Sequence, residues 1–314
     1  WQASTGLKLM VVAAVVASAV GSLVDYCAIA LRMSSIMLGR NIFAAAGRLA
    51  LIVLWPSRPT ADAVFFCWLL PAVLSLAAPL VNFRSAIVRM LRRQQVAADA
   101  ALADRTRLWW GNHLTSVGGA VGTLILPVLV VDRLGAHDAG LFYPTWTLGG
   151  VFFMISPAIA SAFLAGIERN AASLRGPLIF CVKATAALLA LPTFICLAVP
   201  HLVLGILGSA YARSAAPLLV VLALSALPDA VSNIGVAVLR VRGLFTQSAL
   251  VNFGITAVTL ALAWPLLRRF GILGGGLAWL CAQTLGAIAA VLLAHAAGRP
   301  ERPGRVIDHF TSRV

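Results

Sequence analysis

The feature that constrains this chain most is its succession of nine long apolar stretches between residues 8 and 296. A helix needs about 20 apolar residues to cross the roughly 30 Å hydrocarbon core of a bilayer, and it satisfies its own backbone polar groups there. We therefore predict an all-α polytopic membrane protein. The expected transmembrane helices are 8–31, 38–57, 62–84, 108–132, 140–166, 177–203, 215–239, 246–267 and 272–296.

Composition agrees with this class and explains the basic charge. Apolar residues make up 61% of the chain and charged residues 11%, whereas soluble domains carry about 25% charged residues. The formal net charge of +14 comes from basic residues that lie mainly at helix ends, which indicates lipid headgroups and topology rather than nucleic acid. The five cysteines lie within apolar stretches at unrelated spacings, so no disulfide or metal framework is expected.

The distribution of basic residues predicts an orientation. If the first helix runs from outside to inside, sixteen arginines face the cytoplasm and six basic residues face the other side. Short cytoplasmic loops of membrane proteins are enriched in Lys and Arg, so this orientation is favoured and the C-terminus is expected in the cytoplasm. The six residues on the opposite side are Lys8, Arg58, Arg133, Arg213, Arg268 and Arg269.

One long polar segment divides the chain into two groups of helices. We predict a partial N-terminal transmembrane lobe at 1–84, a cytoplasmic linker at 85–107, a six-helix C-terminal transmembrane lobe at 108–296 and a cytoplasmic tail at 297–314. The Arg-rich linker is expected to be solvated, with an amphipathic helix on the membrane surface. A regulatory or partner-docking role is the alternative.

Charged residues inside the first lobe are candidate site residues. A charge at mid-bilayer costs at least about 2.5–3.5 kcal/mol, so each one needs a partner, a wet cavity or a path to the interface. Asp25 is either a proton or cation site, a counter-ion in a central cavity, or a paired structural residue. The Arg48 guanidinium either binds a diphosphate through its planar fork or pairs with Asp25 on the neighbouring helix.

A second candidate lies on one face of the helix at 215–239. Asp229 follows Pro228 and precedes Asn233 by four residues, so the two polar side chains share a helix face. Proline removes a backbone hydrogen bond, and the freed carbonyls beside a carboxylate predict a polar pocket. The face either lines the transport path or is a kink at which Asn233 bridges two helices.

The stretch WWGNHLTSVGGAVGTLILPVLV, residues 109–130, is polar at its start and weak as a helix former in its middle. Asn112 and His113 are expected near the cytoplasmic boundary, where His113 can change charge near neutral pH or serve as a cap or headgroup contact. Gly118 and Gly122 are spaced for close helix approach. A tightly packed helix that bends is what a rocking transporter needs.

No pattern in the chain predicts an enzyme. There is no Walker loop, nucleophile elbow or paired acidic motif, and we expect no catalytic residue, metal or cofactor. The segment DRLGAHDAG, residues 132–140, is predicted to be a turn rather than a metal site. A transporter without a nucleotide site must draw on an ion gradient or the membrane potential.

Three segments of the sequence resemble a known family. They are GNHLTSVGGAVGTLILPVLVVDRLGAHDAGLFYPTWTL (111–148), ILGSAYARSAAPLLVVLALSALPDAVSNIGVAVLRVRG (206–243) and GILGGGLAWLCAQ (271–283). They closely resemble the second half of polysaccharide transporters, the lipid-linked oligosaccharide flippases of the multidrug/oligosaccharidyl-lipid/polysaccharide exporter superfamily. The resemblance covers 108–296 well and 8–84 loosely.

This resemblance implies two six-helix bundles that face each other across a central cavity in the bacterial inner (plasma) membrane. Members are thought to move an undecaprenyl-diphosphate-linked glycan to the outer leaflet by alternating access, for the biosynthesis of cell-surface polysaccharides such as lipopolysaccharide and exopolysaccharide. Polysaccharide polymerases and glycosyltransferases are the implied protein partners. Nine helices with six after the linker match helices four to twelve of a twelve-helix member, so an N-terminally truncated chain is expected.

The resemblance and the positions of the polar residues together predict a role for each candidate site residue. Arg48 contacts the diphosphate, Asp25 and the Asp229/Asn233 face line the cavity or couple ions, and Asn112 with His113 lies near the cytoplasmic gate. Two alternatives stay open. One is an ion-coupled drug or metabolite antiporter of the same fold, and the other is a non-transporting membrane partner of the polysaccharide synthesis machinery.

Overall fold

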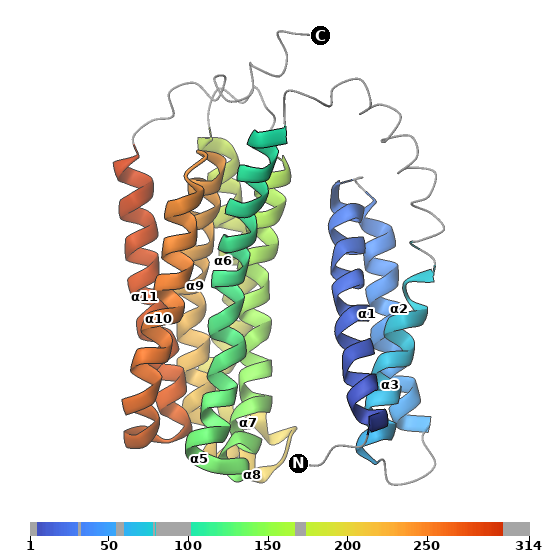
Figure 1. Cartoon of the computed structure of the whole chain (residues 1–314). Helices are drawn as coiled ribbons and strands as arrows, with labels where there is room; N and C mark the ends of the chain where they lie inside the picture. Colours follow the sequence, from blue (N-terminus) through green and yellow to red (C-terminus); the bar gives the residue numbers. More distant parts are fainter. Residues whose placement is uncertain are drawn as a thin grey trace. The chain divides into compact units, whose positions relative to one another are not determined.

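The computed structural model describes residues 5–30, 33–54, 60–77, 79, 102–166 and 174–297. Regular structure within these ranges is helical, and seven helices are long and apolar enough to cross a membrane, which confirms the all-α prediction. The chain divides into two compact units, Trp1–Leu102 and Ala103–Val314 (Figure 1). Residues 85–101 of the expected linker and 298–314 of the expected tail lie outside the described ranges.

The first unit contains three helices, α1 (Thr5–Ala30), α2 (Ser34–Leu54) and α3 (Ala61–Leu74). Val24, Ala28 and Leu76 form its buried apolar cluster. The Thr60 side chain caps α3 by accepting a hydrogen bond from the Ala63 amide at 3.3 Å. α3 ends at Leu74, where Ser75 and Leu76 form a turn, and residues 80–84 of the predicted span lie outside the described residues.

The second unit begins with α5 (Leu102–Gly166), which contains two of the predicted spans. These two helices meet at Gly135, whose φ of 83° and ψ of 178° interrupt the helical geometry. Residues with a side chain rarely adopt this φ, so the glycine permits the reversal that Figure 1 shows at the foot of α5. The reversal lies inside the segment 132–140, for which a turn was predicted, and Gly135 is the residue of that segment that departs from helical geometry.

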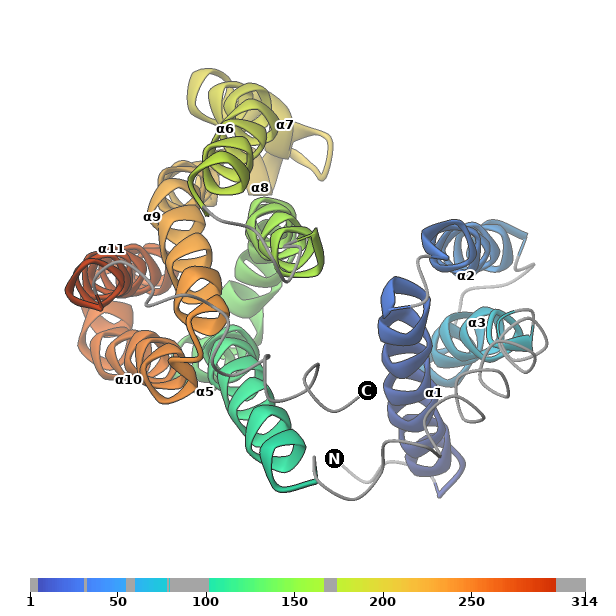
Figure 2. The same ribbon diagram turned by 90° about the horizontal axis from the view of Figure 1, so that it is seen from above.

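The remaining helices follow with short connections. They are α6 (Arg175–Ala198), α7 (Pro200–Gly205), α8 (Ser209–Ser214), α9 (Ala216–Val241), α10 (Phe245–Phe270) and α11 (Ile272–Ala296). The two short helices α7 and α8 occupy the connection that follows α6, and the apolar stretches did not predict them. In the view of Figure 2, α9 lies beside α11, α10 and α6, and these contacts make α9 central to the unit.

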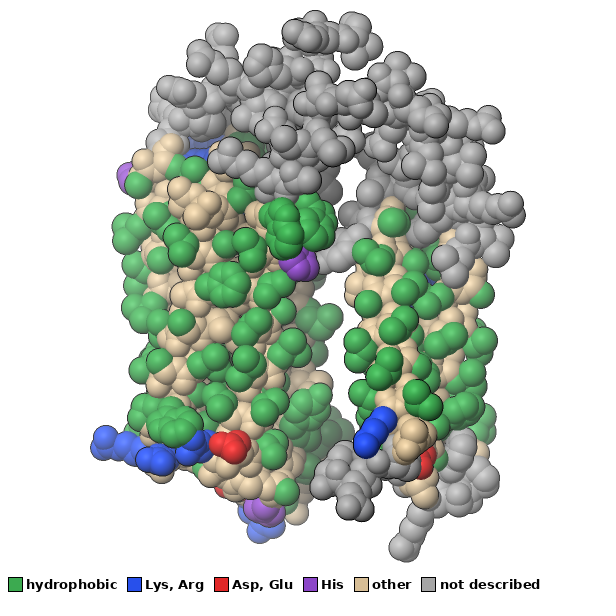
Figure 3. Space-filling view, viewed as in Figure 1, with side chains coloured by type: hydrophobic (Ala, Val, Ile, Leu, Met, Phe, Trp, Pro, Cys, Tyr) green, Lys and Arg blue, Asp and Glu red, His purple; other side chains and the backbone are tan. Residues whose placement is uncertain are grey.

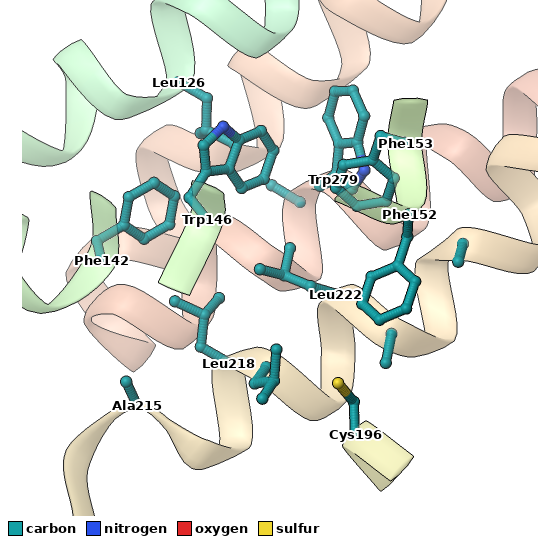
Figure 4. Packing of buried hydrophobic residues seen from close by; sticks show 14 of the residues in the cluster. Leu126, Phe142, Trp146, Phe152, Phe153, Cys196, Ala215, Leu218, Leu222 and Trp279 are labelled. Atoms are coloured by element: carbon teal, nitrogen blue, oxygen red, sulfur yellow. The ribbon is translucent and has the colours of Figure 1, made fainter. Parts of the chain in front are cut away.

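The core of the second unit is a stack of aromatic rings surrounded by leucines (Figure 4). The Phe142 and Trp146 rings stack with centroids 5.5 Å apart, and Trp279 meets Trp146 edge-on at 5.3 Å. Phe153 lies 5.3 Å from Trp279. Offset and edge-to-face contacts of this kind are the favoured geometries of aromatic pairs, so they fix the second half of α5 against α11.

The interface between α5 and α10 explains the unusual stretch at 109–130. A Cβ atom on Gly122 would lie 2.9 Å from Thr256 Oγ1, and one on Gly118 would lie 3.2 Å from Asn252 Cβ. The close approach lets Thr256 Oγ1 donate to the Gly118 carbonyl at 2.8 Å and Asn252 Nδ2 donate to the Thr115 carbonyl at 2.8 Å. The close approach predicted from the glycine spacing is therefore confirmed.

Candidate functional site

Asp229 is the centre of a buried polar cluster in the second unit. Its side chain is 4% exposed, and Ser156 Oγ on α5 donates to its Oδ2 at 2.6 Å. Asn233 Nδ2 donates to the Asp229 carbonyl at 2.9 Å and lies 3.2 Å from Ser156 Oγ, to which it also donates. A hydrogen bond to a charged group contributes about 1.5–3 kcal/mol, so the bond from Ser156 offsets part of the penalty of burying this carboxyl group.

A polar pocket of about 100 Å³ opens beside this carboxyl group. It lies between both halves of α5 and the helices α9, α10 and α11, so it belongs to the second unit alone. Its walls carry carboxyl, hydroxyl, amide and indole groups, which suit a small polar or cationic ligand. The lining residues are Gly118, Gly119, Thr123, Phe153, Pro157, Asp229, Ser232, Asn233, Asn252, Ile255, Thr256, Trp279 and Gln283.

Two prolines flank the hydrogen bond between Ser156 and Asp229. Pro157 follows Ser156 in α5, and Pro228 precedes Asp229 in α9. Because proline has no N–H group, each one leaves the carbonyl four residues earlier without its helical donor. The predicted combination of a proline-altered helix and a carboxyl group is present on α9, and a second proline on α5 lies opposite it.

The sequence reasoning missed most of the polar side chains of this site, including Ser156, Ser232, Trp279 and Gln283. Ser232 Oγ donates to Gln283 Oε1 at 3.0 Å and links α9 to α11. The Trp279 Nε1–H group is buried beside the pocket and has no hydrogen-bond partner among the described residues. Gln283 is the single amide side chain of the span 272–296, and an amide inside a membrane span is the signal that could have identified it.

Asn112 and His113 lie outside this pocket, near the start of α5. Asn112 Oδ1 accepts hydrogen bonds from Arg240 Nε at 2.9 Å and Arg240 Nη2 at 2.6 Å, which joins α5 to the end of α9. The exposed His113 ring stacks on Trp109 with centroids 5.2 Å apart. Asn112 is thus a contact between helices, and a role of either residue at a gate stays a prediction.

The structure corrects one of the two interpretations of Arg48. Asp25 pairs with Arg40, through Nε at 3.0 Å to Oδ1 and through Nη2 to Oδ2, so the suggested pairing with Arg48 is wrong. Arg40 reaches Asp25 because Gly21 leaves room, since a Cβ there would lie 2.9 Å from Arg40 Nη1. The contact between α1 and α2 therefore includes an ion pair between Asp25 and Arg40 that the sequence analysis did not predict.

Arg48 instead lies over an aromatic ring. Its guanidinium carbon is 4.5 Å from the centroid of Trp68 on α3, and its Nε has no hydrogen-bond partner among the described residues. A cation over an indole face is stabilised by the ring quadrupole even where no acid is present. This contact explains how the span holds Arg48 without Asp25.

The Asp25–Arg40 pair makes a stability prediction. Asp25→Asn is expected to lower the free energy of unfolding by about 2 kcal/mol, because Arg40 loses a charged acceptor in a partly buried position. The double variant Asp25→Asn/Arg40→Gln should lose less than the two single variants summed. Equilibrium unfolding in detergent measures all three, and strictly additive losses would show that the pair contributes nothing.

Two solved structures are similar to this chain, whereas no protein-family model and no curated protein matches it. The crystal structure of a MATE proline-to-alanine mutant has a TM-score of 0.56, 15% identity and 85% coverage of this chain. An outward-facing multidrug resistance MATE family transporter of the MOP superfamily has a TM-score of 0.56, 16% identity and 93% coverage.

The partial coverage and the low identity of these two matches limit the comparison to the fold. The chain spans 62% of the length of the first structure and 76% of the second. At this level of identity the likeness concerns the fold. The narrower resemblance to polysaccharide transporters stays a prediction, and the chain is an all-helical membrane protein with the fold of MATE family transporters of the MOP superfamily.

Proposed function

We propose that this chain is a cation-coupled membrane transporter in which Asp229 binds the coupling proton or monovalent cation. The observation that carries the proposal is a buried carboxyl group at a polar pocket inside one unit of a transporter fold. Intramembrane carboxyl groups are expensive to bury and typically mark ion or proton sites. The absence of a Walker loop in the sequence is consistent with a gradient as the source of energy.

The cargo that we propose is an undecaprenyl-diphosphate-linked oligosaccharide in a bacterial inner membrane, with the C-terminus in the cytoplasm. The resemblance of the segments 111–148, 206–243 and 271–283 to polysaccharide transporters supports this cargo. Arg48 is proposed to contact the diphosphate, since stacking on Trp68 orients the guanidinium plane while its N–H edge can donate two parallel hydrogen bonds. Polysaccharide polymerases and glycosyltransferases are the proposed partners.

A second candidate is an ion-coupled drug antiporter. It is favoured by the two solved structures, one of which is a multidrug resistance transporter. The carboxyl-centred pocket suits either candidate, because both need a coupling ion. A non-transporting membrane partner has less support, since neither the fold likeness nor a buried Asp229 is required by such a role.

The two cargoes are separated by one reconstitution experiment. Liposomes that contain the protein are supplied either with a labelled undecaprenyl-diphosphate glycan or with a lipophilic cationic drug, under an imposed proton or sodium gradient. We expect gradient-dependent transfer of the glycan, reduced about tenfold in Arg48→Lys because an ammonium cannot bind a phosphate pair bidentately. Transfer of the drug alone would reject the glycan and support the antiporter.

A further inference from the structure

Three arginines and an indole ring gather at one end of the second unit, away from the Asp229 pocket. The Arg133 guanidinium of α5 lies 3.0 Å from the centroid of the Trp264 ring, and the Arg268 guanidinium of α10 lies 5.6 Å from it. Arg269 lies 5.5 Å from the ring of Phe270. Basic side chains are visible together at this end of the unit (Figure 3, lower left). We refer to Arg133, Trp264, Arg268 and Arg269 as the arginine cluster.

The charge of the cluster is only partly balanced. Within the described residues, the ion pair found here joins Arg133 Nε to Asp132 Oδ2 at 3.3 Å, and the Asp132 side chain is 66% exposed. That contact lacks hydrogen-bond geometry, so the buried Arg133 Nε–H remains an unused donor. Stacking on an aromatic face leaves the N–H edges of a guanidinium available. Among the described residues, Arg133 is thus the one arginine of the three with a carboxylate partner, and that carboxylate is mostly exposed.

The cluster stands where a membrane interface would lie. Trp264 is 45% exposed and Phe270 is 44% exposed, at the end of an apolar span. Trp residues of membrane proteins concentrate at the level of the lipid headgroups. The N-terminus of α11 follows at Ile272 and has no side-chain cap, so its free N–H groups also favour an anion.

Topology and helix dipoles do not account for this arrangement. The positive-inside pattern assigns this end to the outer face, where only six basic residues are expected, and three of them meet here. Arg268 and Arg269 are in the last turn of α10 and interact favourably with its dipole. Arg133 comes from α5, so the dipole of α10 does not explain why it stacks on the same indole.

We propose that the arginine cluster binds the phosphate group of a lipid in the outer leaflet of the membrane that the helices span. Arginine forks match phosphate oxygens in pairs, and the charge that Asp132 leaves unbalanced supplies the attraction. The inference does not depend on the role of Asp229, and with a phospholipid as the ligand it does not depend on the proposed cargo either. The phosphate could belong to an anionic phospholipid or to a polyprenyl diphosphate, and binding measurements with both lipids separate these sources.

The proposal is tested by measuring lipid binding to the detergent-solubilised protein with native mass spectrometry. The probes are phosphatidylglycerol, undecaprenyl diphosphate, inorganic phosphate and, as a zwitterionic reference, phosphatidylcholine. The variants are Arg133→Gln and Arg268→Gln/Arg269→Gln. The second variant alters exposed side chains only and is therefore expected to keep the fold. Arg213→Gln is the matched control, because Arg213 is exposed and predicted on the same side.

We expect anionic lipid to bind about fivefold more weakly for each arginine removed, and Arg213→Gln to bind like the parent. A loss confined to phosphatidylglycerol supports the proposal with a phospholipid as the source. A loss for undecaprenyl diphosphate supports it with a polyprenyl lipid. Equal binding of phosphatidylcholine and phosphatidylglycerol, a loss for inorganic phosphate alone, or the same loss in Arg213→Gln would overturn the proposal.

Discussion

Asp229→Asn is expected to reduce gradient-driven transport about 10- to 100-fold in liposomes that contain the protein, which corresponds to the 1.5–3 kcal/mol typical of interactions with a charged group. The amide keeps the shape of the side chain, so Ser156 and Asn233 still have a neighbour of the same size. An amide cannot carry the charge or accept the proton that a coupling site needs. Uptake of the cargo under an imposed gradient measures the loss.

Stability measurements separate this loss from misfolding. Because burying a charge is unfavourable, the free energy of unfolding of Asp229→Asn should stay equal to that of the parent or rise. Asp138→Asn is the matched control, since Asp138 also belongs to the second unit, on α5, but does not line the pocket. Unimpaired transport by Asp229→Asn, or an equal loss in Asp138→Asn, would refute the assignment of Asp229 as the coupling site.

Gly274→Ala is expected to destabilise the second unit by about 3 kcal/mol, near the upper end of the usual cost of overpacking. Gly274 is in the first turn of α11, and a Cβ there would lie 2.1 Å from the carbonyl oxygen of Leu266 and 2.7 Å from the amide nitrogen of Leu267. Both atoms belong to the α10 backbone and cannot rotate away. The two helices would have to separate, which equilibrium unfolding in detergent measures directly.

Two other glycines provide a graded comparison. A Cβ on Gly286 would lie 2.3 Å from Ile255 Cγ1, a side-chain atom that can move, so Gly286→Ala should cost less than Gly274→Ala. Gly254 is exposed, and a Cβ there would meet no atom of a neighbouring element within 4 Å, so Gly254→Ala should be neutral or stabilising. Equal stability of the Gly274 and Gly254 variants would contradict the packing argument.

The helices were predictable because each one is specified locally. Length, hydropathy and the glycine at 135 determine where a span begins, ends and reverses, and these quantities need no distant partner. The periodicity of a helix likewise places Asp229 and Asn233 on one face, and both line the pocket. The glycine spacing at 118 and 122 identified a contact face in the same way, although not the helix that it meets.

The partners across helices were not predictable from the chain alone. Ser156 and Asp229 are 73 residues apart, and Asn112 and Arg240 are 128 apart. Asp25 pairs with Arg40 rather than Arg48, because Gly21 opens space on α1 for the Arg40 side chain and Arg48 turns to Trp68. Each outcome depends on how far one helix is rotated and shifted against another.

The assignment of this chain to the membrane proteins with many apolar helices, and the position of most of those helices, follow from its amino-acid sequence alone. Lipid tails act on each stretch residue by residue, so hydropathy and length suffice for that result. The meeting of particular polar groups, including the Ser156–Asp229 bond and the arginine cluster on Trp264, emerges only from the packed helices. Lipid supplies no hydrophobic force between helices, so close steric fit at small residues sets these contacts, and that fit does not exist before the helices pack.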